Sequence, residues 1–133
     1  MKKILFIFTL IYSLPSYADW IEINTNLANT TFYADFENVK VNNGYVYYWG
    51  LSDYIKPSPH GHLSAKSLYE LDCKIPRKNR RLSASHYKMP MAKGIADFTN
   101  NEAGEWKYPQ PGTSGGGETE AICQLNDLIS GNK

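Results

Sequence analysis

The densest aromatic stretch of the sequence reads Gly44-Tyr45-Val46-Tyr47-Tyr48-Trp49-Gly50-Leu51-Ser52-Asp53-Tyr54. Side chains alternate between the two faces of a β-strand, so the odd positions of this stretch form one large, apolar face. The even positions are mixed and predict a second, half-solvated face. The preceding Asn42-Asn43-Gly44 is typical of a hairpin turn, because Asn-Gly readily adopts the positive φ angles of tight turns. The stretch therefore predicts the central strand of an antiparallel sheet.

Shorter strand patterns lie on both sides of this stretch. The prolines and glycine within residues 55–62 predict an exposed loop directly after it. In the segment that follows, alternation places Cys73 on the buried face and directs Glu70 and Asp72 toward water. The further strands that we predict are residues 19–23, 30–35, 36–41, 63–73, 82–88 and 95–99.

One helix is predicted, over residues 118–129. Acidic side chains in its first turn suit the helix dipole, and Ser114 or one of the glycines 115–117 would start it. Cys123 lies outside its apolar stripe, at about 100° from Ile122 on the helix surface. Either the helix ends soon after Cys123, or a bond to Cys123 reaches the helix from its flank. The stripe consists of Ala121, Ile122, Leu125, Leu128 and Ile129.

The N-terminus predicts export. Lys2 and Lys3 precede the apolar run Ile4–Leu14, and Ser16-Tyr17-Ala18 fits a signal peptidase site, so we expect residues 1–18 to be removed by cleavage after Ala18. The apolar run is too short for a transmembrane helix, and no later run approaches the roughly 20 apolar residues that one needs. Because no cysteine follows the cleavage site, we expect a periplasmic or secreted protein that is not a lipoprotein.

The net charge argues against one class of partner, and the chain length indicates a single domain. Removal of residues 1–18 takes two lysines and no acids from 14 basic and 13 acidic side chains, which leaves 12 against 13. A net charge of −1 argues against nucleic acid as a general partner. Residues 19–133 are enough for a single domain with its own core.

Cys73 and Cys123 are the only cysteines of the chain. In an exported protein an isolated pair most often forms a disulfide, which over this loop length could contribute up to ~4 kcal/mol of stability. A redox pair would normally be more closely spaced, and a metal site would need further ligands nearby. The structural disulfide is therefore the favoured interpretation of the three.

Several short motifs between Trp20 and Cys123 occur in a recognisable order. They are Trp20, Phe32-Tyr33-x-Asp35, Trp49-x-Leu51-x-Asp53-Tyr54, Ser64-x-Lys66-x-Leu68-x-Glu70-x-Asp72-Cys73, Tyr87, Gly94, Trp106, Pro111-Gly112 and Cys123. Together they resemble the surface-adhesin protein E-like family of Gram-negative bacteria. The resemblance implies an α+β fold, in which a curved antiparallel sheet of about six strands holds a C-terminal helix through a disulfide.

The resemblance also implies a function. The member that names the family is a lipid-anchored outer-membrane adhesin that binds host matrix and serum proteins, whereas most relatives are small exported proteins of unknown role. This chain is thus expected to be a non-catalytic binding protein without a cofactor, whose partners are extracellular-matrix or serum proteins. It differs from the namesake in lacking the lipid-acceptor cysteine. Without that cysteine, export of the protein does not imply its display on the cell surface.

Residues 74–81 form the one strongly basic stretch, and Pro76 predicts a loop. Five cations in so short a segment create a local positive field that could bind an acidic partner. The competing interpretation, which we favour, is a solvated loop whose charges prevent edge-to-edge pairing of strands. The candidate binding residues are Lys74, Arg77, Lys78, Arg80 and Arg81.

Exposed tyrosines are the second candidate. Tyr48 and Tyr54, together with Tyr87 and Tyr108, are more aromatic side chains than so small a core is expected to hold. Aromatic rows on a sheet are more often core than contact surface. Where they stay uncovered they mark a binding patch or a homodimer interface.

His60-Gly61-His62 suggests an alternative function. Two imidazoles at this spacing can share a transition metal, and His86 could supply a third, which would make the protein a small periplasmic enzyme or metal-handling protein. The motif fits a flexible loop equally well, and no carboxylate is placed beside it in the sequence. Nucleophile, zinc-protease and phosphate-loop motifs do not occur in the sequence, so we predict a protein that is not an enzyme.

Overall fold

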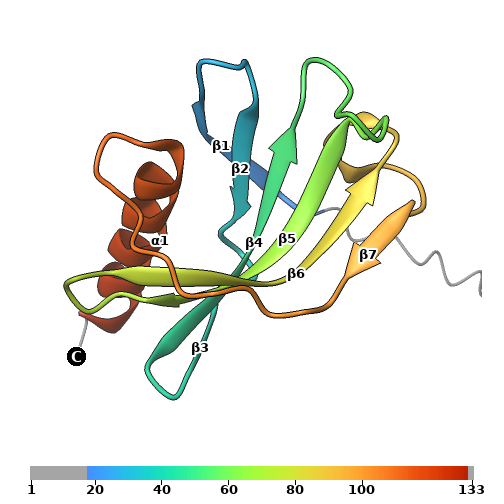
Figure 1. Ribbon diagram of the computed structural model, residues 1–133. Helices are drawn as coiled ribbons and strands as arrows, with labels where there is room; N and C mark the ends of the chain where they lie inside the picture. The colour runs from blue at the N-terminus through green and yellow to red at the C-terminus, as the bar shows by residue number, and fades with distance from the viewer. Residues whose placement is uncertain (1–17, 132–133) are drawn as a thin grey trace, which may run out of the picture.

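The strands form one antiparallel sheet, and the helix α1 lies against one of its faces (Figure 1). The computed structural model describes residues 18–131. Strand order is β1-β2-β4-β5-β6-β7, and β3 pairs with β4 beside β2. The α+β class and the antiparallel sheet are confirmed, with seven strands in the described part. The strands are β1 (Trp20–Thr25), β2 (Thr31–Asp35), β3 (Lys40–Asn42), β4 (Tyr45–Asp53), β5 (Ser64–Asp72), β6 (Lys78–Tyr87) and β7 (Phe98–Asn100).

β4 is the central strand, as predicted. It pairs with β2 and β3 along one edge and with β5 along the other. The turn that joins β3 to β4 contains Asn43 and Gly44, whose φ angles are 52° and 80°. Glycine and asparagine adopt such angles more readily than other residues, so the hairpin predicted from Asn-Gly is confirmed.

The two faces of β4 are reversed relative to the prediction. Val46 and Tyr48 on the even side are each 1% exposed, whereas the odd positions 45–49 are partly exposed. The helix lies on the even side because Gly50 lacks a side chain: a Cβ there would lie 2.8 Å from Glu118 Oε1. The prediction was wrong because alternation separates two faces without identifying the one that another element covers.

α1 (Ser114–Ser130) begins at the first of the predicted starting points. Thr113 is its N-cap, and the Thr113 hydroxyl accepts a hydrogen bond of 3.1 Å from the Gly116 N–H. The glycines after Ser114 form the first turn, so the predicted acids are absent from that turn. Gly116 is needed there because a Cβ would collide with the carbonyl of Gln110. A threonine cap therefore outweighs the low helix propensity of glycine.

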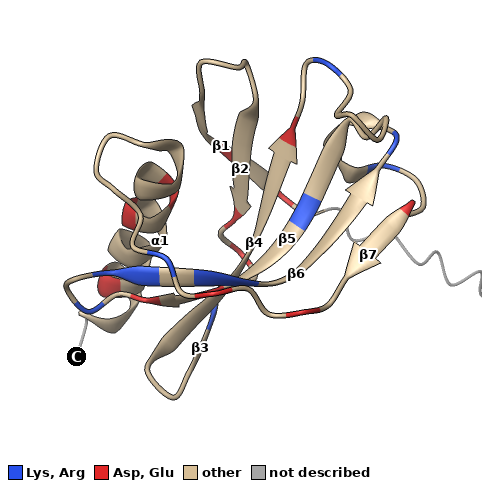
Figure 2. Cartoon of the chain, viewed as in Figure 1, with Lys and Arg blue, Asp and Glu red and all other residues tan. Residues whose placement is uncertain are grey.

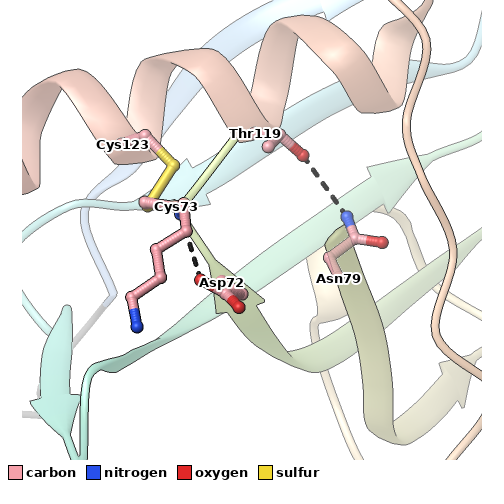
Figure 3. The surroundings of a disulfide bond; sticks show 6 residues. Asp72, Cys73, Asn79, Thr119 and Cys123 are labelled. Carbon is pink, nitrogen blue, oxygen red and sulfur yellow. Dashed lines mark hydrogen bonds between the residues drawn. A yellow bond between two sulfur atoms is a disulfide. The ribbon is translucent and has the colours of Figure 1, made fainter. Parts of the chain in front are cut away.

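A disulfide joins Cys73, just after β5, to Cys123 of α1, with Cα atoms 5.7 Å apart (Figure 3). The β5–β6 hairpin bends toward the helix, and Asn79 Nδ2 donates a hydrogen bond of 3.3 Å to Thr119 Oγ1. Sheet and hairpin cover the helix on two sides, so Ile122 and Cys123 are both fully buried. The second alternative is thus confirmed: the bond reaches the helix from its flank.

The core lies between α1 and the even side of β4. Its fully buried members are Ala34, Val46, Tyr48, Leu71, Ile122 and Cys123. Leu128 and Ile129, which the predicted stripe includes, are 71% and 66% exposed. The stripe is therefore correct at Ile122 and wrong at the C-terminal end, because the helix continues beyond the region that the sheet and hairpin cover.

Two predicted strands are shorter in the structure. The Asp35 carboxylate accepts hydrogen bonds from the N–H groups of Glu37 and Asn38, which makes a turn of the residues between β2 and β3. β7 begins at Phe98 rather than at Ile95, which is 94% exposed. Of the predicted signal peptide only Ala18 lies within the described residues, so cleavage after it stays a prediction.

Candidate binding face

The face of the sheet opposite α1, which we call the open face, carries aromatic and cationic side chains. All three tryptophans of the chain lie on it, each partly exposed. One end is covered by η1 (Pro90–Ala92), whose Met91 N–H donates a hydrogen bond of 2.7 Å to Asp53 Oδ1. By strand register and contact the open face contains Trp20, Tyr33, Tyr45, Tyr47, Trp49, Lys66, Leu68, Glu70, Lys78, Arg80 and Trp106.

Lys66 lies at the centre of the open face. It is the third residue of β5, opposite Leu51 of β4 and Ser85 of β6. Its ammonium lies 4.5 Å from the ring centroid of Trp49 and 6.0 Å from that of Trp20. Both indoles attract the cation through the negative faces of their rings. Figure 2 shows a basic segment on β5, between β4 and β6.

Two adjoining clefts share Lys66 and Ala18, of which Ala18 would be absent from the processed protein because it ends the predicted signal peptide. The larger cleft has a volume of about 850 Å³, and the smaller has about 380 Å³. The larger is also lined by Trp20, Tyr87, Met91, Ala92, Lys93 and Gly94. The smaller is also lined by Asp35, Asn38, Lys40, Trp49 and Leu68. Each cleft therefore combines an indole with at least two lysines.

A second aromatic and cationic cluster lies at the other end of the open face. The ring of Trp106 has the Lys78 ammonium 4.8 Å from its centroid and the Arg80 guanidinium 4.7 Å from it. Tyr45 packs against the same ring at 5.8 Å between centroids. Trp106 is held in place because Lys107, the next residue, pairs with Asn79 of β6.

Glu70 lies beside the second cluster and is 7% exposed, so the prediction that it faces water is wrong. Its carboxylate accepts a hydrogen bond of 2.8 Å from Arg80 Nε and one of 2.7 Å from the Tyr47 hydroxyl. The hydrogen bond to this carboxylate raises the pKa of Tyr47. Alternation placed Glu70 on the correct face, but the sequence does not show that Arg80 and Tyr47 cover it there.

The predicted basic loop is divided by the structure. The loop covers only residues 74–77, because β6 begins at Lys78. Alternation along β6 then places Lys78 and Arg80 on the open face, while Arg81 is paired with Tyr69 on the other side. Figure 2 shows the resulting band of basic residues along the first half of β6. The loop prediction was wrong because strand pairing outweighed the local signal of Pro76. The five predicted cations Lys74, Arg77, Lys78, Arg80 and Arg81 thus occupy a loop and two faces of a strand.

Tyr48 and Tyr54, the two tyrosines predicted as binding residues, do not lie together in the structure. Tyr48 is 1% exposed and is stacked on Tyr69 with 5.2 Å between ring centroids, so the prediction that it is exposed is wrong. Burial raises the pKa of Tyr48 well above its usual value and that of Tyr69 to about 12. Tyr54 is half-buried and lines a separate cleft of about 280 Å³ beside the β1–β2 turn.

The histidines do come together. The ring of His62 lies 6.4 Å from that of His60 and 5.2 Å from that of His86, between centroids. His62 Nε2 shares a hydrogen bond of 2.8 Å with Asp97, which lowers the pKa of that carboxyl. Burial lowers the pKa of His86. Within residues 18–131 no group of three or more His, Cys, Asp or Glu side chains is placed to hold a metal ion. The cluster connects a loop to β6 and gives the metal hypothesis no support.

A family model described as surface-adhesin protein E matches residues 20–124. The match includes every strand, the whole open face and both cysteines of the disulfide. The chain belongs to the surface-adhesin protein E family. The resemblance drawn from the sequence motifs is thereby confirmed.

Solved structures agree with membership of the surface-adhesin protein E family. Crystal form II of Haemophilus influenzae protein E matches with a TM-score of 0.60 and 18% sequence identity, over 81% of this chain and 89% of that chain. A second structure of the same protein matches with a TM-score of 0.59 and 18% identity, over 81% and 86%. At this identity the likeness establishes the fold. No curated protein sequence matches the chain significantly.

Sequence reasoning missed the centre of the open face in this member of the surface-adhesin protein E family. Trp20, Trp49 and Lys66 were not proposed as binding residues, because Trp49 was assigned to the apolar face of the central strand and Trp20 and Lys66 served only as family motif residues. No helix within the described residues combines the length and apolar character needed to cross a membrane.

Proposed function

We propose that this member of the surface-adhesin protein E family is an exported, non-catalytic binding protein whose open face attaches to a host extracellular-matrix or serum protein. Family membership supports a binding role rather than a catalytic one. Cleavage after Ala18 without lipid attachment would leave the processed chain periplasmic or secreted. An adhesive role toward the host then requires release of the protein beyond the outer membrane.

The position of the three tryptophans carries the proposal. They lie on the face of the sheet that α1 leaves free, and each remains partly exposed. Aromatic side chains and arginine are enriched at the centres of protein interfaces, because they bury large areas at small entropic cost. A second copy of this chain is the competing candidate for the same face. A measurement of the oligomeric state distinguishes a second copy from a host protein.

Charge on the open face favours an acidic partner. Arg80 is compensated by Glu70, whereas Lys66 and Lys78 make no ion pair with any described carboxylate. Cations of this kind steer an acidic partner and raise its association rate more than its final affinity. The effect weakens as salt shortens the screening length from about 10 Å at 0.1 M to about 3 Å at 1 M.

Surface plasmon resonance of the processed protein over immobilised vitronectin and laminin tests the proposal. We expect Trp106→Ala to raise the dissociation rate about tenfold with little dependence on salt, because it removes an interface anchor. Lys78→Gln should slow association at low salt only. Tyr108→Ala is the matched control, because Tyr108 is 55% exposed and lies outside the open face.

Two results would contradict the proposal. The first is no response from the wild-type protein at micromolar concentration. The second is an equal loss of binding in Tyr108→Ala and Trp106→Ala. Sedimentation analysis completes the test: a dimer that Trp106→Ala dissociates would assign the open face to a second copy instead.

A further inference from the structure

Lys66 is a cation without an anion. Among residues 18–131 the ion pairs join Arg80 to Glu70 and join His62 and Lys88 to Asp97, so none involves Lys66. Its partners across β4 and β6, Leu51 and Ser85, carry no charge. Lys66 is partly buried, and a bound anion would supply the charge partner that the described residues do not.

Within the described residues, the one carboxylate that lines the paired clefts, that of Asp35, already has hydrogen-bond partners. Asp35 lines the smaller cleft and is 3% exposed. Its Oδ1 accepts hydrogen bonds of 3.2 Å from the N–H groups of Glu37 and Asn38, and its Oδ2 accepts one of 2.7 Å from Asn38 Nδ2. These bonds hold the carboxylate in the turn after β2 and leave Lys66 to an external anion.

Three lysines surround the paired clefts. Lys66 lies where the clefts meet, Lys40 lines the smaller one and Lys93 lines the larger one. The volumes of about 380 and 850 Å³ lie in the usual range of about 300–1,000 Å³ for small-molecule sites. The charge therefore selects an anionic ligand, and the volume suits a ligand of one or two sugar rings.

The two indole rings favour a ligand with a flat face that can stack on them. The ring centroids of Trp49 and Trp20 lie 4.5 and 6.0 Å from the Lys66 ammonium. The face of an indole ring is electron-rich and attracts the weakly positive C–H groups on the flat side of a pyranose ring. A sugar ring that carries a carboxylate can stack on an indole and pair with the lysine at the same time.

We propose that the paired clefts bind an acidic sugar, a pyranose carrying a carboxylate, with Trp20 and Trp49 stacking on the ring and Lys66 pairing with the carboxylate. The inference rests on the proposed function, because it names the chemistry by which the open face would recognise a glycosylated host protein. Uronic acids and sialic acids share this chemistry, and the ligands below distinguish them.

An acidic peptide segment is the rival ligand. Peptides commonly bind a sheet by adding a strand at a free edge. That mode is not open at Lys66, because β5 is already paired with β4 on one side and β6 on the other. The compact clefts in the interior of the face therefore favour a ring over an extended chain.

The test compares ligands that differ in their acid group. Isothermal titration calorimetry and saturation-transfer NMR of the processed protein would use 3′-sialyllactose against lactose, and a hyaluronan tetrasaccharide against chitotetraose. We expect at least one acidic sugar to bind about tenfold or more tightly than its neutral counterpart. Equal binding of the acidic and neutral members of both pairs, or tighter binding of an oligo-glutamate peptide, would overturn the proposal.

A matched pair of lysine variants locates the site. Lys66→Met retains the unbranched side chain but removes the charge, and should weaken acidic-sugar binding about tenfold. Lys56→Met is the control, because Lys56 is exposed in the loop between β4 and β5, outside the open face and both clefts. Equal loss in both variants would overturn the local site. The ligand comparison on wild-type protein decides the proposal even where Lys66→Met fails to fold.

The outcomes separate this inference from the proposed function. Sugar binding without any response to vitronectin or laminin leaves the inference standing and rejects the proposed function. Binding to those proteins that is unchanged by sialidase, by hyaluronidase and by Lys66→Met rejects the inference and leaves the proposed function standing.

Discussion

The carboxyl group of Glu118 occupies the space that a side chain at residue 50 would fill. It is 8% exposed, and Glu118 Oε1 has no hydrogen-bond partner among the described residues. Burial raises the pKa of Glu118 to about 7, although the Tyr48 hydroxyl lowers it in part. The helix therefore packs on the sheet through an acid that is neutral below neutral pH and costs free energy once ionised.

Glu118→Gln should change how stability depends on pH. In the unfolded chain the carboxyl ionises near 4.5 and in the folded protein near 7, so wild-type stability falls as pH rises between these values. The total fall is up to about 3 kcal/mol at 1.4 kcal/mol per pKa unit. The neutral glutamine removes it, so the variant should be more stable than wild type at pH 8 and similar at pH 4.

Urea unfolding at pH 4, 6 and 8 measures this difference. Glu120→Gln is the matched control, because Glu120 is exposed on the same helix and should leave the pH profile unchanged. Parallel profiles for wild type and Glu118→Gln would show that the buried carboxyl does not set the pH dependence.

At the scale of elements, the most local features were predictable. The Asn-Gly turn and the length of β4 followed from residues that are adjacent in sequence, and the disulfide followed from two cysteines in an exported chain. The first turn of α1 was missed because Thr113 caps a run of glycines that propensity alone would exclude. The covered face of β4 was missed because Gly50 has meaning only once α1 is placed against it.

The candidate site was less predictable than the fold. The basic residues were identified, but strand pairing divided them between a loop and two faces. The pairing of Lys66 with Trp20 and Trp49 joins β5 to β1 and β4, which are far apart in sequence. Such a contact depends on the register between strands, which residue alternation within one strand does not reveal.

Loss of the disulfide should loosen α1 before the sheet. The bond closes a loop of 50 residues, and its reduction, or Cys73→Ser with Cys123→Ser, should lower the free energy of unfolding by roughly 2–5 kcal/mol. Hydrogen exchange should quicken first in α1, because β4 keeps partners on both edges. Reduced wild type is the comparison that leaves composition unchanged. Equal acceleration in α1 and β4 would contradict this order of opening.

At the scale of the whole molecule, a net charge near zero conceals an uneven distribution. Three lysines surround the paired clefts, while the acids of α1 lie on the opposite side of the sheet. A partner approaching from solution therefore encounters a local field that the total charge does not report. The same reasoning explains why composition alone excluded nucleic acid but identified no ligand.

Processing of the exported chain is a prediction at this scale. Mass spectrometry of the exported protein should find Asp19 as the first residue without an acyl mass, because a short apolar segment precedes a small-residue cleavage site. Ala18→Arg, which places a large charged residue at that site, should accumulate the uncleaved chain. Intact Met1 in the wild-type protein, or a lipid adduct, would contradict the prediction.

Ala18 lines both clefts of the open face, which has a practical consequence for any binding assay. An affinity tag or fusion joined ahead of Asp19 would begin at the mouth of the proposed site. A sensor chip that captures the protein by that end would hold the open face against the chip surface and block binding. Attachment after α1, which lies against the face of the sheet opposite the open face, keeps the clefts facing solution.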